Sequence, residues 1–211
     1  MNKRIFYRIG LYTVAGFIAF TLYARANTPP ETDQEYCDRT GRVKIHDRYF
    51  KYDVYEHGEM KPIVDMLSKD CNGNEYCEVD RIYKYVLSIP YKESSTNRNP
   101  SDVINQHGGD CDEKSFLLAT LFLQKGYPCV FVTTKDHVFI AVHIPNEDVL
   151  KKPFSYLTIG TNKYYFAEST FSAGYIGQYN NVNQQEIDAI FDMVSKKEIP
   201  LDKVEFTITK R

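Results

Sequence analysis

Apolar and polar side chains follow two different repeats along this chain, one typical of helices and one typical of strands. Apolar positions three and four residues apart predict helices over residues 63–68, 75–87 and 110–125, with a polar loop at 92–100. Alternation predicts one or two short strands within 43–55, and further strands over 130–134, 137–144, 156–159, 164–168 and 204–209. Helical spacing recurs near the end of the chain and predicts a final helix over 184–196. Helices followed by antiparallel strands indicate an α+β fold.

The helix over 110–125 has the clearest boundaries. Asp110 is a favourable N-cap residue, and Glu113 three positions later completes the sequence of a capping box. Gly126 suits the left-handed conformation that ends many helices. Cys111 is therefore expected at the first position of a long helix.

The first 26 residues have the pattern of an export signal. A basic start is followed by an uncharged, mostly apolar run over 9–24, and the small residues Ala24 and Ala26 stand where a signal peptidase would cleave. The run is shorter than the about 20 apolar residues that span a bilayer. We expect a cleaved signal peptide, with a retained N-terminal membrane anchor as the alternative.

This pattern sets the expected domain organisation. Residues 1–26 form the signal or anchor, residues 27–41 with their paired prolines form a linker, and residues 42–211 form one domain. The domain is expected outside the cytoplasm, either periplasmic, extracellular or tethered to the membrane through residues 9–24, because the basic end of such a segment stays inside.

Charge argues against nucleic acid as a partner. The whole chain has 26 basic and 28 acidic residues, and a formal charge of −2. The N-terminal 26 residues contain four of the basic residues and none of the acidic ones, so the remainder is mildly acidic. A nucleic-acid-binding domain usually presents a basic face. Composition gives no information on the oligomeric state.

Five cysteines need separate interpretations in an exported domain, where pairing is the default. Cys71 and Cys77 flank a turn signal and could close a small disulfide loop, and Cys37 could instead pair with either. A zinc site is the competing hypothesis for these thiols, but no matching pair of ligands occurs elsewhere. Cys129 lies in a predicted strand and reads as a small buried hydrophobe.

The remaining thiol, Cys111, carries the candidate chemistry. Unpaired N–H groups and the positive end of the helix dipole favour a thiolate at the first helical position. Asp110, Asp112 and Glu113 oppose a second negative charge there. A base is therefore needed to accept the thiol proton.

His137 is the candidate base, and Glu168 the carboxylate that would orient it. His137 begins one predicted strand and Glu168 ends the next long one, so pairing of these strands would bring the two side chains together. Cys111, His137 and Glu168 would then form a nucleophile, base and orienter. His143, at the far end of the His137 strand, is the rival base.

Three stretches also resemble the transglutaminase-like superfamily. They are Gly-Asp-Cys-Asp-Glu-Lys-Ser at 109–115 with the Leu-Leu-Ala and Gly-Tyr-Pro that follow, His-Val-Phe at 137–139, and Tyr-Tyr-Phe-Ala-Glu-Ser-Thr at 164–170. The resemblance covers residues 82–177. It implies a papain-like core with a Cys-bearing helix packed on an antiparallel sheet, with Cys111 as nucleophile, His137 as general base and acid, and Glu168 as the orienting carboxylate.

The sequence departs from that family at two positions. Many relatives have Asp where Glu168 stands and Trp where Asp112 stands. The extra methylene of Glu168 must then be absorbed by a shift of the backbone.

The resemblance implies acyl transfer through a thioester, with a peptide or protein as substrate and no cofactor. We expect a peptidase or amidase, because water is abundant outside the cell. A cross-linking transglutaminase and an inactive scaffold module remain the alternatives. The Cys111 N–H is one expected oxyanion donor, and the second stays open among Tyr91, Asn105 and Gln106. Calcium at the acidic loop 146–148 lacks the spacing of a known site.

Overall fold

The computed structural model describes most of the chain beyond residue 60. Its described residues are 32, 35–36, 39, 42–45, 48–51, 58, 60–95, 98–146, 154–171, 173–178 and 184–209. The N-terminal run 9–24, Cys37 and the acidic pair Glu147 and Asp148 lie outside them. Residues 37–211 form one compact unit, which holds every helix and strand named below. Within the described ranges, no helix is long and apolar enough to cross a membrane.

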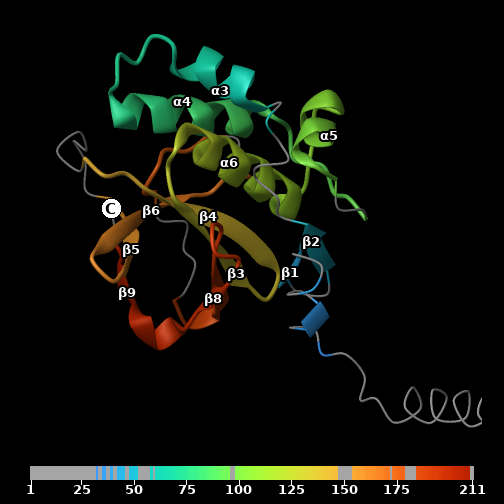
Figure 1. Ribbon diagram of the computed structural model, residues 1–211, viewed down its shortest axis with the longest axis vertical. Coiled ribbons are helices and arrows are strands. Elements are labelled where there is room, and N and C mark those ends of the chain that lie inside the picture. The colour runs from blue at the N-terminus through green and yellow to red at the C-terminus, as the bar shows by residue number, and fades with distance from the viewer. Residues whose placement is uncertain are drawn as a thin grey trace, which may run out of the picture. The chain divides into compact units, whose positions relative to one another are not determined.

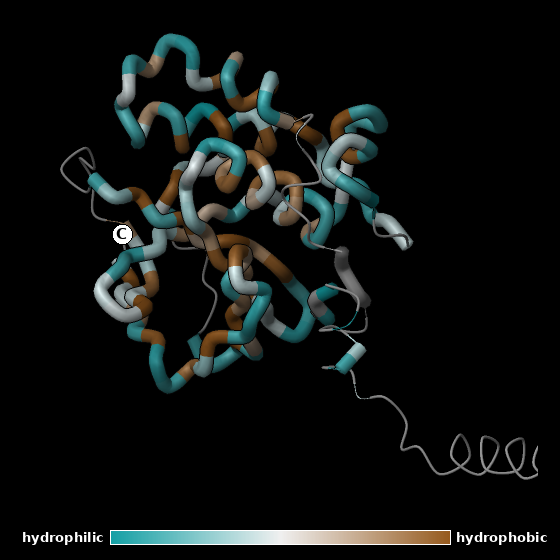
Figure 2. The backbone as a smooth tube through the Cα atoms, in the orientation of Figure 1, coloured by the Kyte–Doolittle hydropathy of each residue, from teal (hydrophilic) through white to brown (hydrophobic). Residues whose placement is uncertain are grey.

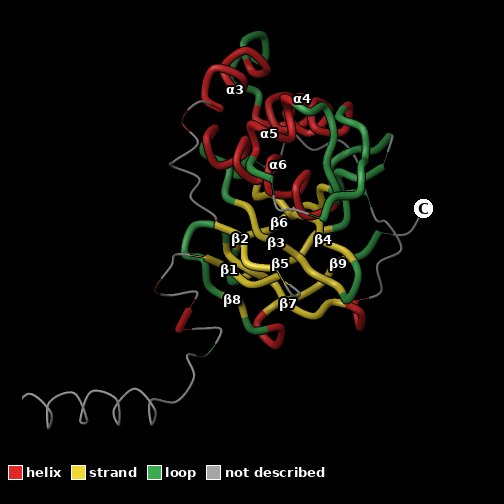
Figure 3. The backbone as a smooth tube through the Cα atoms, turned by 90° about the vertical axis from the view of Figure 1, so that its right-hand side faces the viewer, coloured by secondary structure: helices red, strands yellow, loops and turns green. Residues whose placement is uncertain are grey.

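This unit has helices on one side and an antiparallel sheet on the other (Figures 1 and 3). Its α-helices are α3 (Lys61–Ser68), α4 (Glu75–Ser88), α5 (Pro100–Asn105) and α6 (Cys111–Lys125). The sheet has the order β8-β7-β3-β4-β6-β5-β9, and every pair of neighbours is antiparallel. The predicted α+β class is therefore confirmed.

The strands of the sheet follow the alternating segments of the sequence, except for β7, discussed below, and the two-residue β8, which was not predicted. They are β3 (Cys129–Thr134), β4 (His137–His143), β5 (Tyr156–Ile159), β6 (Asn162–Ala167), β7 (Ile187–Asp192), β8 (Glu198–Ile199) and β9 (Val204–Thr207). A separate hairpin pairs β1 (Arg42–Ile45) with β2 (Arg48–Lys51).

Helix α6 is the central element of the core. It packs against α3, α4 and α5 on one side and against β3 and β4 on the other, so its residues 112–122 are buried. The hydropathy view shows this apolar centre, with polar residues along the outer helices (Figure 2). Alternate residues of β4 belong to two different clusters: Val138, Ile140 and Val142 face the helical core, and Phe139 and Ala141 face the other side of the sheet.

The predicted helix over 184–196 is wrong, because this segment forms a short 3₁₀ turn and strand β7. In the pairing with β3, Thr134 faces Ile187 whereas Thr133 faces Ala189, so Asp188 is an extra residue at a bulge. The bulge places Ile187 and Ile190 in the same cluster although they are three residues apart. A bulged strand therefore reproduced the spacing of a helix.

Helix α5 was not predicted, because its six residues are too few to show a periodic pattern. Its local signals are nevertheless present: Asn99 caps the helix by accepting a hydrogen bond from the Asp102 N–H, and Pro100 occupies the first turn. The helix carries the chain toward the loop that precedes Cys111.

Candidate active site

The first turn of α6 is fixed by buried carboxylates. The Asp110 side chain accepts a hydrogen bond from the Glu113 N–H at 3.1 Å, and Glu113 accepts in return from the Asp110 N–H at 3.3 Å, which completes the predicted capping box. Arg98 binds Glu113 through Nε at 2.9 Å and also through its backbone N–H. Burial opposes the charge on Glu113, but the bonds from Arg98 outweigh it and lower the pKa of this carboxyl.

Cys111 begins this helix, with a free, partly exposed thiol. Its Sγ lies 3.5 Å from Oδ1 of Asp112, which is itself buried. The first N–H groups of a helix have no acceptor within the helix. The Cys111 sulfur thus lies at the end of α6 that presents free backbone N–H groups, and the Asp110–Glu113 capping box holds this end in place.

His137, the first residue of β4, lies between this thiol and Glu168. Its Nε2 is 2.5 Å from Glu168 Oε2, and Cys111 lies near enough to act on the charge of its ring. Because Nε2 faces the carboxylate, Nδ1 is left for the sulfur. Burial lowers the pKa of His137, but the bonds and charges of Cys111 and Glu168 outweigh it and raise the pKa to about 10. The geometry therefore stabilises an imidazolium.

Glu168 is held in place by neighbours on two elements. Its second carboxylate oxygen, Oε1, accepts bonds from the N–H and the hydroxyl of Thr170, at 2.8 and 2.7 Å. Its backbone carbonyl accepts a bond of 2.6 Å from the buried hydroxyl of Tyr83 on α4. Burial raises the pKa of Glu168, but bonds from His137 and Thr170 prevail and lower it. The orienting carboxylate is thus ionised and immobile.

A hydrogen bond from α6 to β4 sets the distance between nucleophile and base. Ser115, one turn after Cys111, is fully buried and donates at 3.1 Å to the carbonyl of Val138, the neighbour of His137. Because this bond joins the helix start to the strand start, it keeps Cys111 and His137 together. The structure therefore brings together all three residues that the sequence singled out.

The rival base His143 lies at the other end of β4. Its Nδ1 is 2.9 Å from the carbonyl of Lys163, and its ring contacts Tyr164. Six residues of extended strand span about 20 Å. His143 is therefore far from Cys111 and belongs to the sheet.

Tyr91 lies beside the loop that leads into Cys111. It forms a parallel bridge with Gly109, where Gly109 N–H donates to the Pro90 carbonyl at 3.3 Å and Lys92 N–H donates to the Gly109 carbonyl at 3.0 Å. The Tyr91 side chain is half exposed. Burial first and the nearby Cys111 second raise the pKa of its phenol, and Cys111 acts more strongly than Asp110.

The other two candidate oxyanion donors are differently placed. The Gln106 side-chain oxygen accepts a bond from Arg98 at 2.9 Å, and its backbone oxygen accepts one from Lys92. Asn105 ends the short helix α5 and is exposed. Of the three, Tyr91 is the one whose backbone pairs with Gly109, two residues before Cys111.

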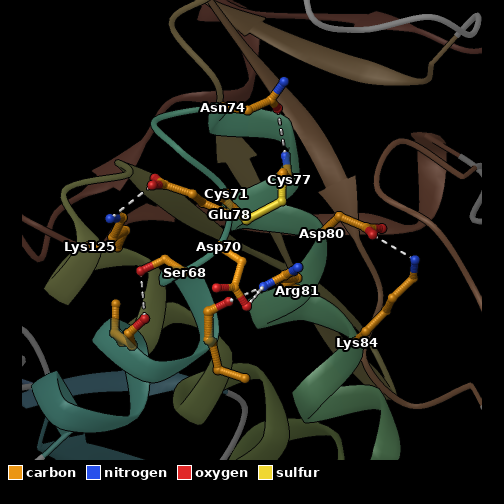
Figure 4. The surroundings of a disulfide bond; sticks show 12 residues. Ser68, Asp70, Cys71, Asn74, Cys77, Glu78, Asp80, Arg81, Lys84 and Lys125 are labelled. Carbon is orange, nitrogen blue, oxygen red and sulfur yellow. Dashed lines mark hydrogen bonds and ion pairs between the residues drawn. A yellow bond between two sulfur atoms is a disulfide. The ribbon is translucent and has the colours of Figure 1, made fainter.

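The other three described thiols, Cys71, Cys77 and Cys129, are separate from this site. Cys71 and Cys77 form the anticipated disulfide at the start of α4, where Asn74 caps the helix and the Glu78–Lys125 ion pair lies nearby (Figure 4). Cys129 is fully buried, which raises the pKa of its thiol. No group of three or more His, Cys, Asp or Glu side chains among the described residues is arranged to hold a metal ion.

Several residues of the site were not anticipated from the sequence. Thr170 holds Glu168 from two residues away, and Tyr83, Ser115 and Lys114 hold the site or its surroundings through bonds between distant segments. Only Thr170 had a local signal, since a hydroxyl two positions after a carboxylate can bond back to it. The others depend on packing that the sequence pattern does not encode.

Comparisons with known proteins give a weak structural likeness. No protein-family model and no curated protein match the chain. Among solved structures, a "putative cysteine protease" from Cytophaga hutchinsonii is 14% identical, with a TM-score of 0.44 over 71% of this chain and 46% of that one. A "putative protease" from Parabacteroides distasonis is 15% identical, with a TM-score of 0.45 over 69% of this chain and 28% of that one. This chain spans less than half of either protein, and such similarity assigns no function.

Proposed function

We propose that this protein is an exported thiol-dependent acyl-transfer enzyme that uses Cys111, His137 and Glu168 as a catalytic triad and acts as a peptidase or amidase. One observation carries the proposal: a single imidazole is hydrogen-bonded to a buried carboxylate and lies near a free thiol that acts on its charge. This arrangement can transfer the thiol proton to His137 and stabilise the resulting charge pair. The proposal follows the papain-like and transglutaminase-like resemblance of the sequence.

The reaction proceeds through a thioester. The Cys111 sulfur bonds to the carbonyl carbon while the π electrons move to the oxygen, and on collapse the carbon–nitrogen bond breaks. The leaving amine takes a proton from the His137 imidazolium. Water then attacks the thioester with His137 accepting its proton, and the acid product leaves as the thiol is regenerated. Glu168 holds the ring and the charge during both steps.

Tyr91 is the second oxyanion donor in this mechanism, beside the Cys111 N–H. Its backbone is held by the bridge to Gly109, two residues before the nucleophile, and Cys111 acts on the pKa of its phenol. Burial and the neighbouring charges keep it protonated, so it can donate. An oxyanion donor of this kind contributes roughly 10²–10³-fold to the rate.

Export is part of the proposal and is supported by two features. The N-terminal pattern over residues 1–26 is typical of an export signal, and the Cys71–Cys77 disulfide suits an oxidising compartment. N-terminal sequencing of the protein recovered from the expressing cell would show whether the chain is cut near Ala26. A mature chain starting at Met1 in the cytoplasm would contradict export without affecting the triad.

Labelling and turnover together test the function. Iodoacetamide should label Cys111 but not the buried Cys129, as mapped by peptide mass spectrometry. p-Nitrophenyl acetate should be hydrolysed by wild type and by Cys129→Ala, but not by Cys111→Ala. Turnover that persists in Cys111→Ala would refute the proposal. Addition of methylamine to the same assay separates the outcomes, because an amine-transferring enzyme would accumulate N-methylacetamide.

The role of Tyr91 has its own test, because alkylation by iodoacetamide forms no oxyanion whereas attack on an ester does. Tyr91→Phe should lower acylation by p-nitrophenyl acetate about 100-fold and leave the alkylation rate within twofold. Tyr85→Phe on α4 is the matched control and should change neither rate. Equal losses in both reactions of Tyr91→Phe would argue against an oxyanion role.

A further inference from the structure

The most unusual charged group near the site is Lys114, a lysine on α6 one turn after Cys111. Its side chain is 1% exposed, and its ammonium donates a hydrogen bond of 2.6 Å to the carbonyl of Ile89. Burying an ammonium is costly, and a methionine of similar length would fill the same space without a charge. Burial indeed lowers the pKa of Lys114 to about 8, against the opposing effect of Glu168.

The bond of Lys114 holds the segment that carries Tyr91. Ile89 is the residue at which α4 ends, and Pro90, Tyr91 and Lys92 then run beside Gly109. Two backbone hydrogen bonds at Gly109 join this segment to the loop before Cys111, and Lys92 Nζ donates to the Gln106 carbonyl at 3.2 Å. Lys114 adds a connection from the start of α6, one turn after Cys111, to the start of the same segment.

We propose that Lys114 is a positioning residue for acyl transfer: its ammonium binds the Ile89 carbonyl and thereby holds Tyr91 beside Cys111. This inference rests on the proposed function and adds a residue to it. Lys114 does not touch the reacting atoms. It acts through Tyr91, so its loss affects the steps in which an oxyanion forms and spares direct alkylation of the sulfur.

A double-mutant cycle in the full-length protein tests the inference, with p-nitrophenyl acetate and iodoacetamide as probes. Lys114→Met should lower acylation by about tenfold and leave alkylation within twofold. In the Tyr91→Phe background the same substitution should change acylation by less than twofold, because the group it positions is already gone. Lys84→Met, at an exposed position of α4, is the matched control and should be silent in both backgrounds.

Two results would overturn the inference while leaving the proposed function intact. One is a Lys114→Met variant with acylation equal to wild type, and the other is an equal loss in both backgrounds. A purely structural role of Lys114 would give such an equal loss. By contrast, if wild type neither alkylates at Cys111 nor turns over the ester, the proposed function itself fails.

Titration of wild type provides a measurement that does not depend on the folding of a variant. Between pH 7 and 9.5, Lys114 loses its proton, and a neutral donor holds the carbonyl about half as strongly. The charged group that acts on Lys114 is Glu168 after β6, which keeps its protonation state over this range. The background rates measured with Cys111→Ala are first subtracted. The ratio of the acylation rate to the alkylation rate should then fall about fivefold in wild type and stay constant in Tyr91→Phe. A constant ratio in wild type would overturn the inference.

Discussion

Glu168→Gln is the substitution that tests the triad most directly, because it keeps the shape of the side chain. The amide oxygen can still accept the two bonds from Thr170 that Oε1 accepts now. The amide nitrogen then faces His137 Nε2, where it donates a proton instead of accepting one. The imidazole is thus forced into the tautomer that carries its proton on Nδ1, toward the thiol, and it cannot accept the Cys111 proton.

The size of the effect follows from the electrostatics of His137. A pKa of about 10 in place of the usual 6.5 corresponds to roughly 5 kcal/mol in favour of the imidazolium. Cys111 and Glu168 share this stabilisation. If the Glu168 carboxylate supplies about half of this free energy, its removal costs roughly 2–3 kcal/mol. The population of the thiolate–imidazolium pair of Cys111 and His137 then falls by about 100-fold. The wrong tautomer adds to this, so hydrolysis of p-nitrophenyl acetate should fall by about 10²–10⁴-fold.

Alkylation by iodoacetamide against pH measures the same change without substrate binding. His137 accepts the thiol proton less readily in Glu168→Gln, so the acid limb of the alkylation profile should move to higher pH by roughly one to two units. Glu205→Gln on the exposed edge strand β9 is the matched control and should match wild type. A Glu168→Gln protein with turnover within threefold of wild type and an unmoved acid limb would refute the proposed triad.

Two further predictions concern stability. Arg98→Ala leaves Glu113 buried without its cation and should destabilise the fold by about 3 kcal/mol in urea unfolding, against less than about 1 kcal/mol for Arg81→Ala in an exposed pair. Because pairing lowers the pKa of Glu113, the loss of unfolding free energy in Arg98→Ala should be full above about pH 5 and shrink toward pH 3. A loss that does not depend on pH would contradict the pairing of Arg98 with an ionised Glu113. Reduction of Cys71–Cys77 should cost about 2 kcal/mol, as expected for a short loop, and no change in the unfolding midpoint with dithiothreitol would contradict this.

The sequence predicted the elements with strong local signals. The capping box at Asp110 and Glu113 and the glycine at 126 defined α6 to the residue, and alternation located the strands that carry His137 and precede Glu168. The order of the predicted strands also suggested that these residues would approach each other. All these features depend on side chains close together in the chain.

The features that escaped prediction depend on pairing between distant segments. The strand β7 was read as a helix because a bulge at Asp188 spaced its buried residues by three, and only the partner strand β3 reveals that bulge. Lys114 appeared as one more residue of a charged helix start, since nothing local shows that Ile89 would lie above it. Tyr91 was one of three candidates until its bridge to Gly109 distinguished it.

The three groups of the site come from a helix start, a strand start and the residue after a second strand, and these lie 57 positions apart along the chain from Cys111 to Glu168. During synthesis Cys111 therefore leaves the ribosome before His137 and Glu168, which the proposed triad needs to activate its thiol. A nascent chain carries an ordinary thiol until the sheet has closed around β4 and β6. Under the proposed function, a chain that has not yet folded therefore cannot attack other molecules through this site.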